Sequence, residues 1–151
     1  MTETREIPGP MQTVGVMILN PERDKILLVK HKEAAGNQTD IYGFPAGRIE
    51  LGEAPREAAV RELFEETGFT AKEEDLKSFE GNYFTTDLQR SNGDLRRANF
   101  TLYFCEVVEG ELRDSDETLP EWVEISEINN LNTMPNIDIA IENFLKSEKN
   151  E

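Results

Sequence analysis

The stretch from residue 47 to residue 69, GRIELGEAPREAAVRELFEETGF, restricts the fold of this chain more than any other segment. Residues 54–67 are rich in Ala, Glu, Arg and Leu, which favour a helix, and Pro55 is tolerated in a first helical turn. Gly68 follows at the position where helices commonly end in a left-handed residue. The pattern predicts a helix over residues 54–67 that is closed by this glycine.

Three glutamates of the predicted helix share one face. Glu62, Glu65 and Glu66 stand at i, i+3 and i+4, so their side chains lie close together. Crowded carboxylates repel one another, and proteins accept such a cluster mainly where a cation lies between them. Oxygen ligands suit Mg²⁺ or Mn²⁺, and Mg²⁺ bound by a few carboxylates keeps waters and takes phosphate oxygens as further ligands. For three glutamates alone, a solvated acidic surface remains the alternative.

The spacing across the whole segment resembles the signature of the Nudix hydrolase family, G-x5-E-x7-R-E-hydrophobic-x-E-E-x-G-hydrophobic. Its fixed positions are Gly47, Glu53, Arg61, Glu62, Leu63, Glu65, Glu66, Gly68 and Phe69. The resemblance implies an α/β fold in which a mixed β-sheet is sandwiched between α-helices, an α/β/α sandwich. It also implies an enzyme that hydrolyses a nucleoside diphosphate linked to another group X.

The resemblance implies Mg²⁺, with Mn²⁺ as the alternative, bound at the acidic face. The expected ligands are the carboxylates of Glu62, Glu65 and Glu66, the carbonyl of Ala46 just before the first motif glycine, and Glu117 from a later loop. Glu117 is the best-placed acidic residue outside the motif, as an additional ligand or as the base. A merely exposed acidic loop is an equal alternative for it.

The predicted catalytic residues are Glu53, Arg61, Glu62, Glu65 and Glu117. Because an arginine keeps its proton, Arg61 is expected to orient a neighbouring carboxylate, and Glu53 is the candidate for this pairing. Glu53 itself is either a ligand in the metal shell or the group that takes a proton from water. The identity of the base stays open between these acidic residues.

The substrate class is inferred by elimination. Many ADP-ribose hydrolases of the family carry a proline shortly after the motif, where this chain has Phe84, and the diadenosine polyphosphate subgroup carries a tyrosine where it has Thr86. The expected substrate is therefore a nucleoside triphosphate or a modified, oxidised nucleotide that is cleaved to a monophosphate. ADP-ribose, another nucleotide sugar or a dinucleotide is the alternative substrate. A non-catalytic nucleotide-binding regulatory module is the alternative of another class.

Charge and composition limit the partners and the location. With 16 basic and 31 acidic residues the net charge is −15, which disfavours nucleic acid and anionic membranes as partners but not a small nucleotide that arrives with a divalent metal. No apolar run reaches the length of a membrane span, and the N-terminus lacks a signal-peptide pattern. The single cysteine, Cys105, lies in an apolar run and is expected to be a buried, inert thiol in the reducing cytoplasm. Homodimers are frequent in the resembled family, so a homodimer is a further expectation.

The remaining pattern predicts one domain over residues 1–151 with flexible ends at 1–11 and 147–151. Strands are expected at 13–19, 25–31, 78–88, 97–108 and 121–125, an Asn-Gly hairpin turn at 91–94 and an amphipathic helix at 135–146. The only histidine, His31, ends a predicted strand, and a surface or substrate-edge role is favoured over metal binding. The aromatic side chains of Tyr83, Phe84 and Phe44 could stack on a base, although core packing is the favoured interpretation.

Overall fold

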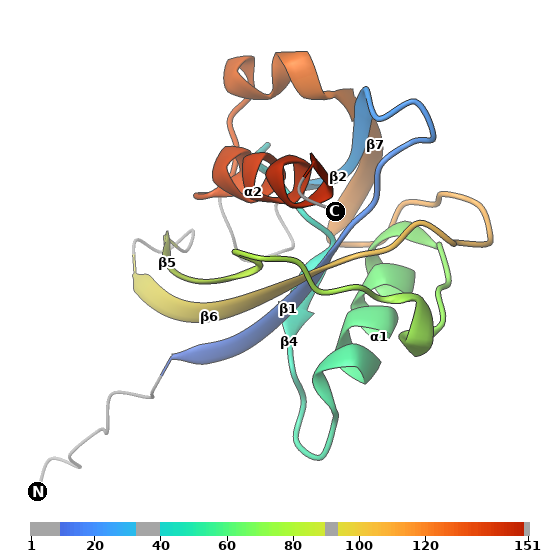
Figure 1. The fold of residues 1–151 in the computed structure, drawn as a ribbon. Helices are drawn as coiled ribbons and strands as arrows, with labels where there is room; N and C mark the ends of the chain where they lie inside the picture. Colours follow the sequence, from blue (N-terminus) through green and yellow to red (C-terminus); the bar gives the residue numbers. More distant parts are fainter. Residues whose placement is uncertain (1–9, 33–39, 90–93, 150–151) are drawn as a thin grey trace, which may run out of the picture.

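The computed structural model describes residues 10–32, 40–89 and 94–149, whose strands form two sheets (Figure 1). The first sheet has the order β4-β1-β6-β5, formed by Ala46–Arg48, Met11–Met17, Leu95–Phe104 and Tyr83–Gln89. The second has the order β3-β2-β7, formed by Tyr42–Gly43, Lys25–His31 and Thr118–Glu124. The helices are α1 (Pro55–Thr67) and α2 (Ile137–Lys149), with short 3₁₀ helices η2 (Glu73–Asp75) and η3 (Ile125–Asn130).

The first sheet is mixed and the second is antiparallel. Strand β1 runs parallel to β6, with Val14 opposite Thr101, and antiparallel to β4, with Val14 opposite Gly47. The predicted α/β class is confirmed, although the single mixed sheet expected from the sequence is divided into two. Parallel pairing of β1 with β6 requires a long crossover, and here the crossover includes the motif helix α1.

The two long helices cover opposite faces of β1, as Figure 1 shows. Successive side chains of a strand point to opposite faces, so Val14 and Val16 pack with Leu63 of α1. Met17 instead packs in a second cluster with Phe144 of α2. Both clusters are buried, and together they produce the sandwich of helices around sheets.

Both ends of the described chain are more ordered than expected. Strand β1 begins at Met11, which pairs with Ala98, so Met11 does not belong to the flexible end predicted over residues 1–11. Helix α2 continues to Lys149, beyond the predicted end at residue 146. Its last turn is held because Arg23 Nη2 donates to Glu148 Oε2 at 2.7 Å.

Besides β1, which spans Met11–Met17 instead of 13–19, three strands differ in their bounds from the prediction. Strand β5 begins at Tyr83, because a turn with Gly81 at φ +85° interrupts the apolar pattern before it. Strand β6 ends at Phe104, four residues before the predicted end. Strand β7 begins at Thr118 rather than residue 121, since Thr118 pairs with His31 of β2. The predicted hairpin turn at 91–94 lies largely outside the described residues.

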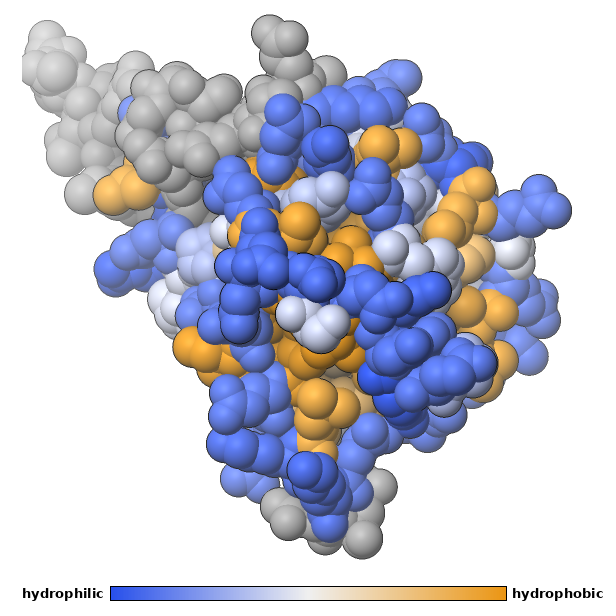
Figure 2. Space-filling model, turned by 90° about the horizontal axis from the view of Figure 1, so that it is seen from above, coloured by the Kyte–Doolittle hydropathy of each residue, from blue (hydrophilic) through white to orange (hydrophobic). Residues whose placement is uncertain are grey.

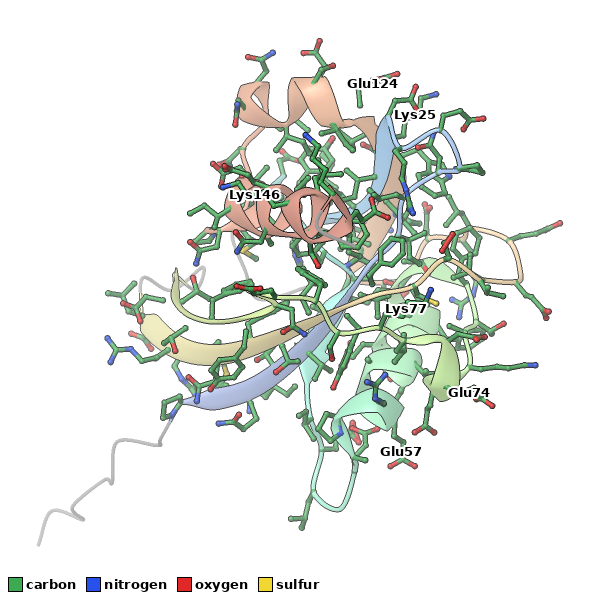
Figure 3. The ribbon with its side chains drawn as sticks, in the orientation of Figure 1. Lys25, Glu57, Glu74, Lys77, Glu124 and Lys146 are labelled. Atoms are coloured by element: carbon green, nitrogen blue, oxygen red, sulfur yellow. The ribbon has the colours of Figure 1, made fainter. Side chains whose placement is uncertain are left out.

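The surface is mainly hydrophilic, in keeping with the composition. Seen from above in Figure 2, apolar side chains show between larger hydrophilic areas. Figure 3 shows Lys25 and Glu124, which pair across β2 and β7 with their charged atoms 4.0 Å apart. Within the described ranges, no helix is long and apolar enough to cross a membrane.

Candidate active site

Helix α1 begins and ends as the sequence predicts. Pro55 occupies its first turn, and the Ala54 backbone N–H donates to Glu57 Oε1 at 3.1 Å. At the other end, Gly68 has φ +88° and its N–H donates to Phe64 O at 2.9 Å. This left-handed closure would be strained in any residue with a Cβ. The helix therefore presents its acidic face at a fixed angle to strand β4.

Glu66 is the most enclosed carboxylate at this face. Its side chain is buried, and Oε1 accepts a hydrogen bond from the Ala46 backbone N–H at 2.6 Å. Desolvation raises the pKa of Glu66 well above its usual range, and the negative charges of Glu62 and Glu117 add to the effect. A nearby cation would stabilise the charged form of this carboxylate.

Glu62 lies directly against the backbone of β4. A Cβ placed on Gly47 would stand 2.3 Å from the carboxyl carbon of Glu62, so a side chain there would displace it. Burial raises the pKa of Glu62 to about 7, although hydrogen bonding to Arg61 acts in the opposite direction. Gly47 is thus required by the close approach of a carboxylate to the main chain.

Arg61 connects three carboxylates of the motif. Its Nε and Nη2 donate to the two oxygens of Glu53 at 2.7 and 2.9 Å, the bidentate arrangement expected for this pair. Nη1 donates to Glu62 Oε1 at 2.8 Å and to Glu65 Oε1 at 2.9 Å. Nη2 also donates to the Arg48 carbonyl at 3.0 Å. The guanidinium therefore fixes the acidic cluster to the loop between β4 and α1.

Glu53 is stabilised as an anion. Hydrogen bonds from Arg61, and then from the Glu50 backbone N–H, lower its pKa to about 2. A carboxylate with so low a pKa is a weak base at neutral pH, so the contacts favour a positioning role over proton transfer. Glu65 is half exposed, and the hydrogen bonds of its carboxylate come from Arg61.

Glu117 stands directly before β7, at the end of a turn that is held against α1. Ser115 Oγ accepts from the backbone N–H groups of Glu117 and Thr118 at 3.2 and 2.9 Å. Thr118 Oγ1 in turn donates to the Glu66 carbonyl at 3.1 Å. Glu117 is exposed, as the surface-loop alternative requires, yet its charge contributes to the raised pKa of Glu66. The fold thus brings together two acidic residues that are far apart in sequence.

The donor set fits a divalent cation of the Mg²⁺ type. Glu62 and Glu66 are largely buried carboxylates whose pKa values are raised, chiefly by burial and further by neighbouring negative charges, so a cation beside them would favour their charged forms. Among the described residues, no group of three or more His, Cys, Asp or Glu side chains is arranged to enclose a metal ion. A hard cation that keeps waters and takes substrate oxygens does not need such an enclosure.

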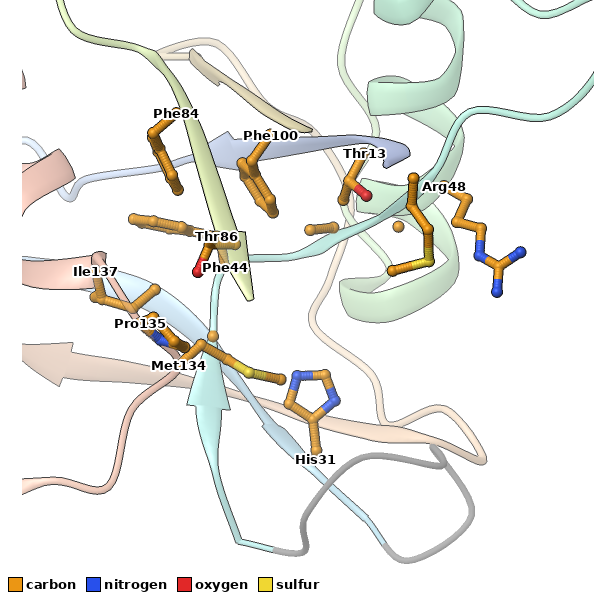
Figure 4. Close-up of a pocket in the computed structure, with 14 residues that line it drawn as sticks. Thr13, His31, Phe44, Arg48, Phe84, Thr86, Phe100, Met134, Pro135 and Ile137 are labelled. Atoms are coloured by element: carbon orange, nitrogen blue, oxygen red, sulfur yellow. The ribbon is translucent and has the colours of Figure 1, made fainter. Parts of the chain in front are cut away.

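A pocket adjoins this cluster and shares strand β4 with it (Figure 4). The cavity has a volume of about 140 Å³ and opens to solvent. The walls are Met11, Thr13, His31, Gly43, Phe44, Ala46, Gly47, Arg48, Phe84, Thr86, Phe100, Met134, Pro135 and Ile137. Phe84 and Phe100 stack with their ring centres 5.2 Å apart and their planes 10° from parallel.

The aromatic residues considered from sequence divide between core and pocket. Phe44 belongs to the core and also lines the pocket, and Phe84 is partly buried in the wall. Tyr83 is 56% exposed and lies outside the wall, so the core packing favoured for it is wrong. Sequence reasoning missed Phe100 and Met134, because nothing local indicates that β6 and the segment before α2 meet here.

Cys105 is buried, as predicted. Its Sγ donates to the Val107 carbonyl at 3.4 Å, and burial raises the pKa of the thiol. A thiol with a raised pKa carries little thiolate at neutral pH, so Cys105 is unreactive.

Comparison with known proteins agrees with the motif and the fold. A family model described as the NUDIX domain matches residues 9–144. The chain is 39% identical to the 8-oxo-dGTP diphosphatase of Escherichia coli over 57 residues. This alignment covers 38% of this chain and 43% of that protein. It is 33% identical to the ADP-ribose pyrophosphatase of Methanocaldococcus jannaschii over 126 residues. This alignment covers 83% of this chain and 66% of that protein.

The solved structures extend the likeness to the fold. A NUDIX hydrolase from Nitrosomonas europaea superposes with a TM-score of 0.73 at 24% identity, covering 91% of this chain and 89% of that one. The chain spans less than half the length of most curated relatives that it matches. In those cases the alignment extends over only 57 to 69 residues, which is less than the whole domain.

Proposed function

The chain belongs to the Nudix hydrolase family, a family acting on phosphoric anhydride bonds, and we propose that it cleaves a nucleoside triphosphate or an oxidised nucleotide to a monophosphate. The observation that carries the proposal is the pair of carboxylates of Glu62, largely buried, and Glu66, buried, which both lie against the backbone of β4. Mg²⁺, with Mn²⁺ as the alternative, is the cation proposed for this pair.

Each residue of the cluster has a physical role in the proposed reaction. A bound divalent cation would neutralise the pyrophosphate and lower the pKa of a coordinated water. Glu62, Glu66 and the Ala46 carbonyl would hold it, with Glu65 and Glu117 as further candidates. Arg61 fixes Glu53 and Glu62 in place, so that little reorganisation is needed when substrate binds.

Glu117 is the proposed proton acceptor. Among the described residues no group donates a hydrogen bond to its carboxylate, whereas both oxygens of Glu53 accept bonds from Arg61. Its position at the start of β7 places it beside the end of α1, where Glu66 lies. Glu53 is the alternative acceptor, but its lowered pKa makes it the weaker base.

ADP-ribose is a second candidate substrate. The longer of the two alignments reported above, over 126 residues, is with an ADP-ribose pyrophosphatase. Phe84 occupies the position where many ADP-ribose hydrolases of the family are expected to carry proline, and this favours the triphosphate. RNA is disfavoured because a net charge of −15 repels a phosphate backbone. We also propose that the protein forms a homodimer, because homodimers are frequent in the family.

A substrate panel with and without Mg²⁺ tests the proposal. It contains nucleoside triphosphates, 8-oxo-dGTP, ADP-ribose, dinucleoside polyphosphates and a capped RNA, with products identified chromatographically. Glu66→Gln should lower kcat at least about 10²-fold, because it removes the buried charge that would bind the cation. Glu124→Gln, a change at a half-exposed residue at the far end of β7, is the matched control.

Two results would overturn parts of the proposal. Preferred turnover of ADP-ribose would replace the substrate class while leaving the reaction intact. No turnover of any compound by the folded wild-type protein would favour the regulatory binding module. Circular dichroism and thermal unfolding of each variant would separate lost chemistry from lost structure.

A further inference from the structure

His31 lies in the wall of the pocket rather than on the surface, so of the two roles expected for it the surface role is wrong and the substrate-edge role stays a prediction. It ends β2, and its side chain lies beside Met134 in Figure 4. The residue is only 9% exposed. Within the described ranges, Nδ1 is buried with no hydrogen-bond partner, the one such side-chain atom found there. A buried nitrogen without a partner costs folding free energy, so the fold holds the imidazole in this wall at a cost to stability.

The edge of the ring that carries Nε2 faces Gly43, another pocket residue. A Cβ placed on Gly43 would stand 3.5 Å from Nε2 and 3.1 Å from Met134 Cγ. The glycine therefore leaves space in front of the imidazole that any other residue would fill. Nε2 makes no hydrogen bond to a described residue and, unlike Nδ1, is not fully buried, so it is open to a molecule in the pocket.

Burial also decides the charge of the imidazole. Desolvation lowers the pKa of His31 to about 4, so the ring is neutral at physiological pH. A neutral imidazole offers one donor and one acceptor, and it can therefore bind a polar edge of either kind. A permanent cation at this position would instead select for anions.

The remaining walls suit a flat ring. Phe84 and Phe100 form a stacked aromatic wall, and Phe44 and Met134 contribute further apolar surface. Ala46 and Gly47 join the pocket to the carboxylates, because Ala46 binds Glu66 and Gly47 touches Glu62. A nucleotide with phosphates at the carboxylates would thus place its base among the aromatic side chains.

We propose that His31 is a specificity-determining residue, whose imidazole hydrogen-bonds the polar edge of a nucleobase seated in this pocket. The inference rests on the proposed function for the identity of the ligand as a nucleotide. It assigns His31 to binding and not to chemistry, since among the described residues no carboxylate of the acidic cluster hydrogen-bonds to the ring, although His31 pairs with Thr118 beside Glu117. Its loss should therefore change KM more than kcat.

The chain's single histidine permits a direct binding test that does not depend on turnover. In protein freed of any histidine tag, the two imidazole ¹⁵N signals are followed during titration with AMP, GMP, 8-oxo-GMP, CMP and UMP. Ribose 5-phosphate and pyrophosphate are the matched ligands without a base. Nucleoside monophosphates should shift the nitrogen signals, whereas the ligands without a base should not.

Variants then separate recognition from packing. His31→Phe should raise KM about tenfold for the preferred nucleotide with little change in kcat, as expected for one lost hydrogen bond. His31→Gln places an amide near the position of Nε2 and should restore part of the affinity. Lys30→Gln, at the neighbouring position of β2, controls for substitution at this strand end. Thermal unfolding identifies a variant that fails to fold, and the wild-type titration remains decisive in that case.

The outcomes distinguish the two proposals. Equal shifts from ribose 5-phosphate, or hydrolysis of nucleotides with no shift of the His31 nitrogens, would overturn the role of His31 and leave the reaction standing. Base-dependent shifts without hydrolysis of any nucleotide would support His31 and overturn the proposed reaction. A fall in kcat at unchanged KM in His31→Phe would also refute the specificity role.

Discussion

The acidic cluster, formed by Glu53, Glu62, Glu65, Glu66 and Glu117, and the aromatic pocket are neighbours that are built in opposite ways. All but Glu117 of the cluster comes from one continuous segment, whose helix fixes the spacing of Glu62, Glu65 and Glu66. The pocket takes its walls from β1, β2, β3, β4, β5, β6 and the segment that leads into α2. The proposed metal site is thus encoded locally, whereas the proposed base pocket depends on the whole tertiary fold.

This difference explains how much the sequence could predict. The limits of α1, its closing glycine and the pairing of Arg61 with Glu53 follow from local spacing, and the structure has all three. Helix periodicity is a strong local signal because each residue's neighbours are three or four positions away.

The pocket could not be predicted in the same way. Phe84 and Phe100 meet through the pairing of β5 with β6, and Met134 arrives from a third region of the chain. Strand pairing is set by contacts between distant segments, so its register is not visible in either segment alone. The burial of His31 was missed for the same reason, since Gly43 and Met134 enclose it from elsewhere.

The largest effect is expected from a substitution in β4 that displaces a carboxylate of the acidic cluster. Gly47→Ala places a Cβ where the Glu62 carboxyl group now lies, 2.3 Å from its carbon. Displacing a catalytic carboxylate by about 1 Å should lower kcat about 10²-fold. Steady-state kinetics measure the loss, and Leu51→Ala, at a fully exposed residue of the loop between β4 and α1, is the control. Unchanged kcat would show that Glu62 does not need this position.

The pocket makes its own contribution to the dependence of stability on pH. Because the pKa of His31 is lowered to about 4, the unfolded chain binds more protons than the folded one between that pH and about 6.5. This contribution is complete above pH 6.5 and is lost as the pH falls, by about 2 kcal/mol at pH 5. Urea unfolding at pH 7 and pH 5 should show this loss in wild type and a smaller one in His31→Gln. Equal losses in both proteins would show that His31 is not buried as a neutral ring.

Arg61→Lys tests whether the acidic cluster needs the several hydrogen bonds of a guanidinium group or only a positive charge. Lysine keeps the charge but cannot bind both oxygens of Glu53 while also reaching Glu62. We expect kcat to fall about tenfold with KM nearly unchanged. The exposed pair of Arg97 with Asp87, 3.1 Å apart, offers Arg97→Lys as the control with no effect. Wild-type kinetics in Arg61→Lys would reduce its role to charge balance.

The smallest effect is expected from the aromatic wall. Phe84→Leu removes the ring stacked on Phe100 but keeps an apolar side chain, so the KM for a nucleotide should rise only about threefold. Tyr83→Leu, at an exposed residue outside the wall, is the control. A large fall in kcat from Phe84→Leu would contradict the separation between recognition and chemistry.

Strand β4 gives this separation an evolutionary consequence. The contact of residue 46 with Glu66 is made by the main-chain N–H, which every amino acid except proline possesses. The side chain of the same residue lines the pocket. Mutation can therefore reshape the substrate-facing surface at this position while the anchor of the carboxylate is inherited unchanged. Such a scaffold can acquire new substrates by single substitutions without first losing its chemistry.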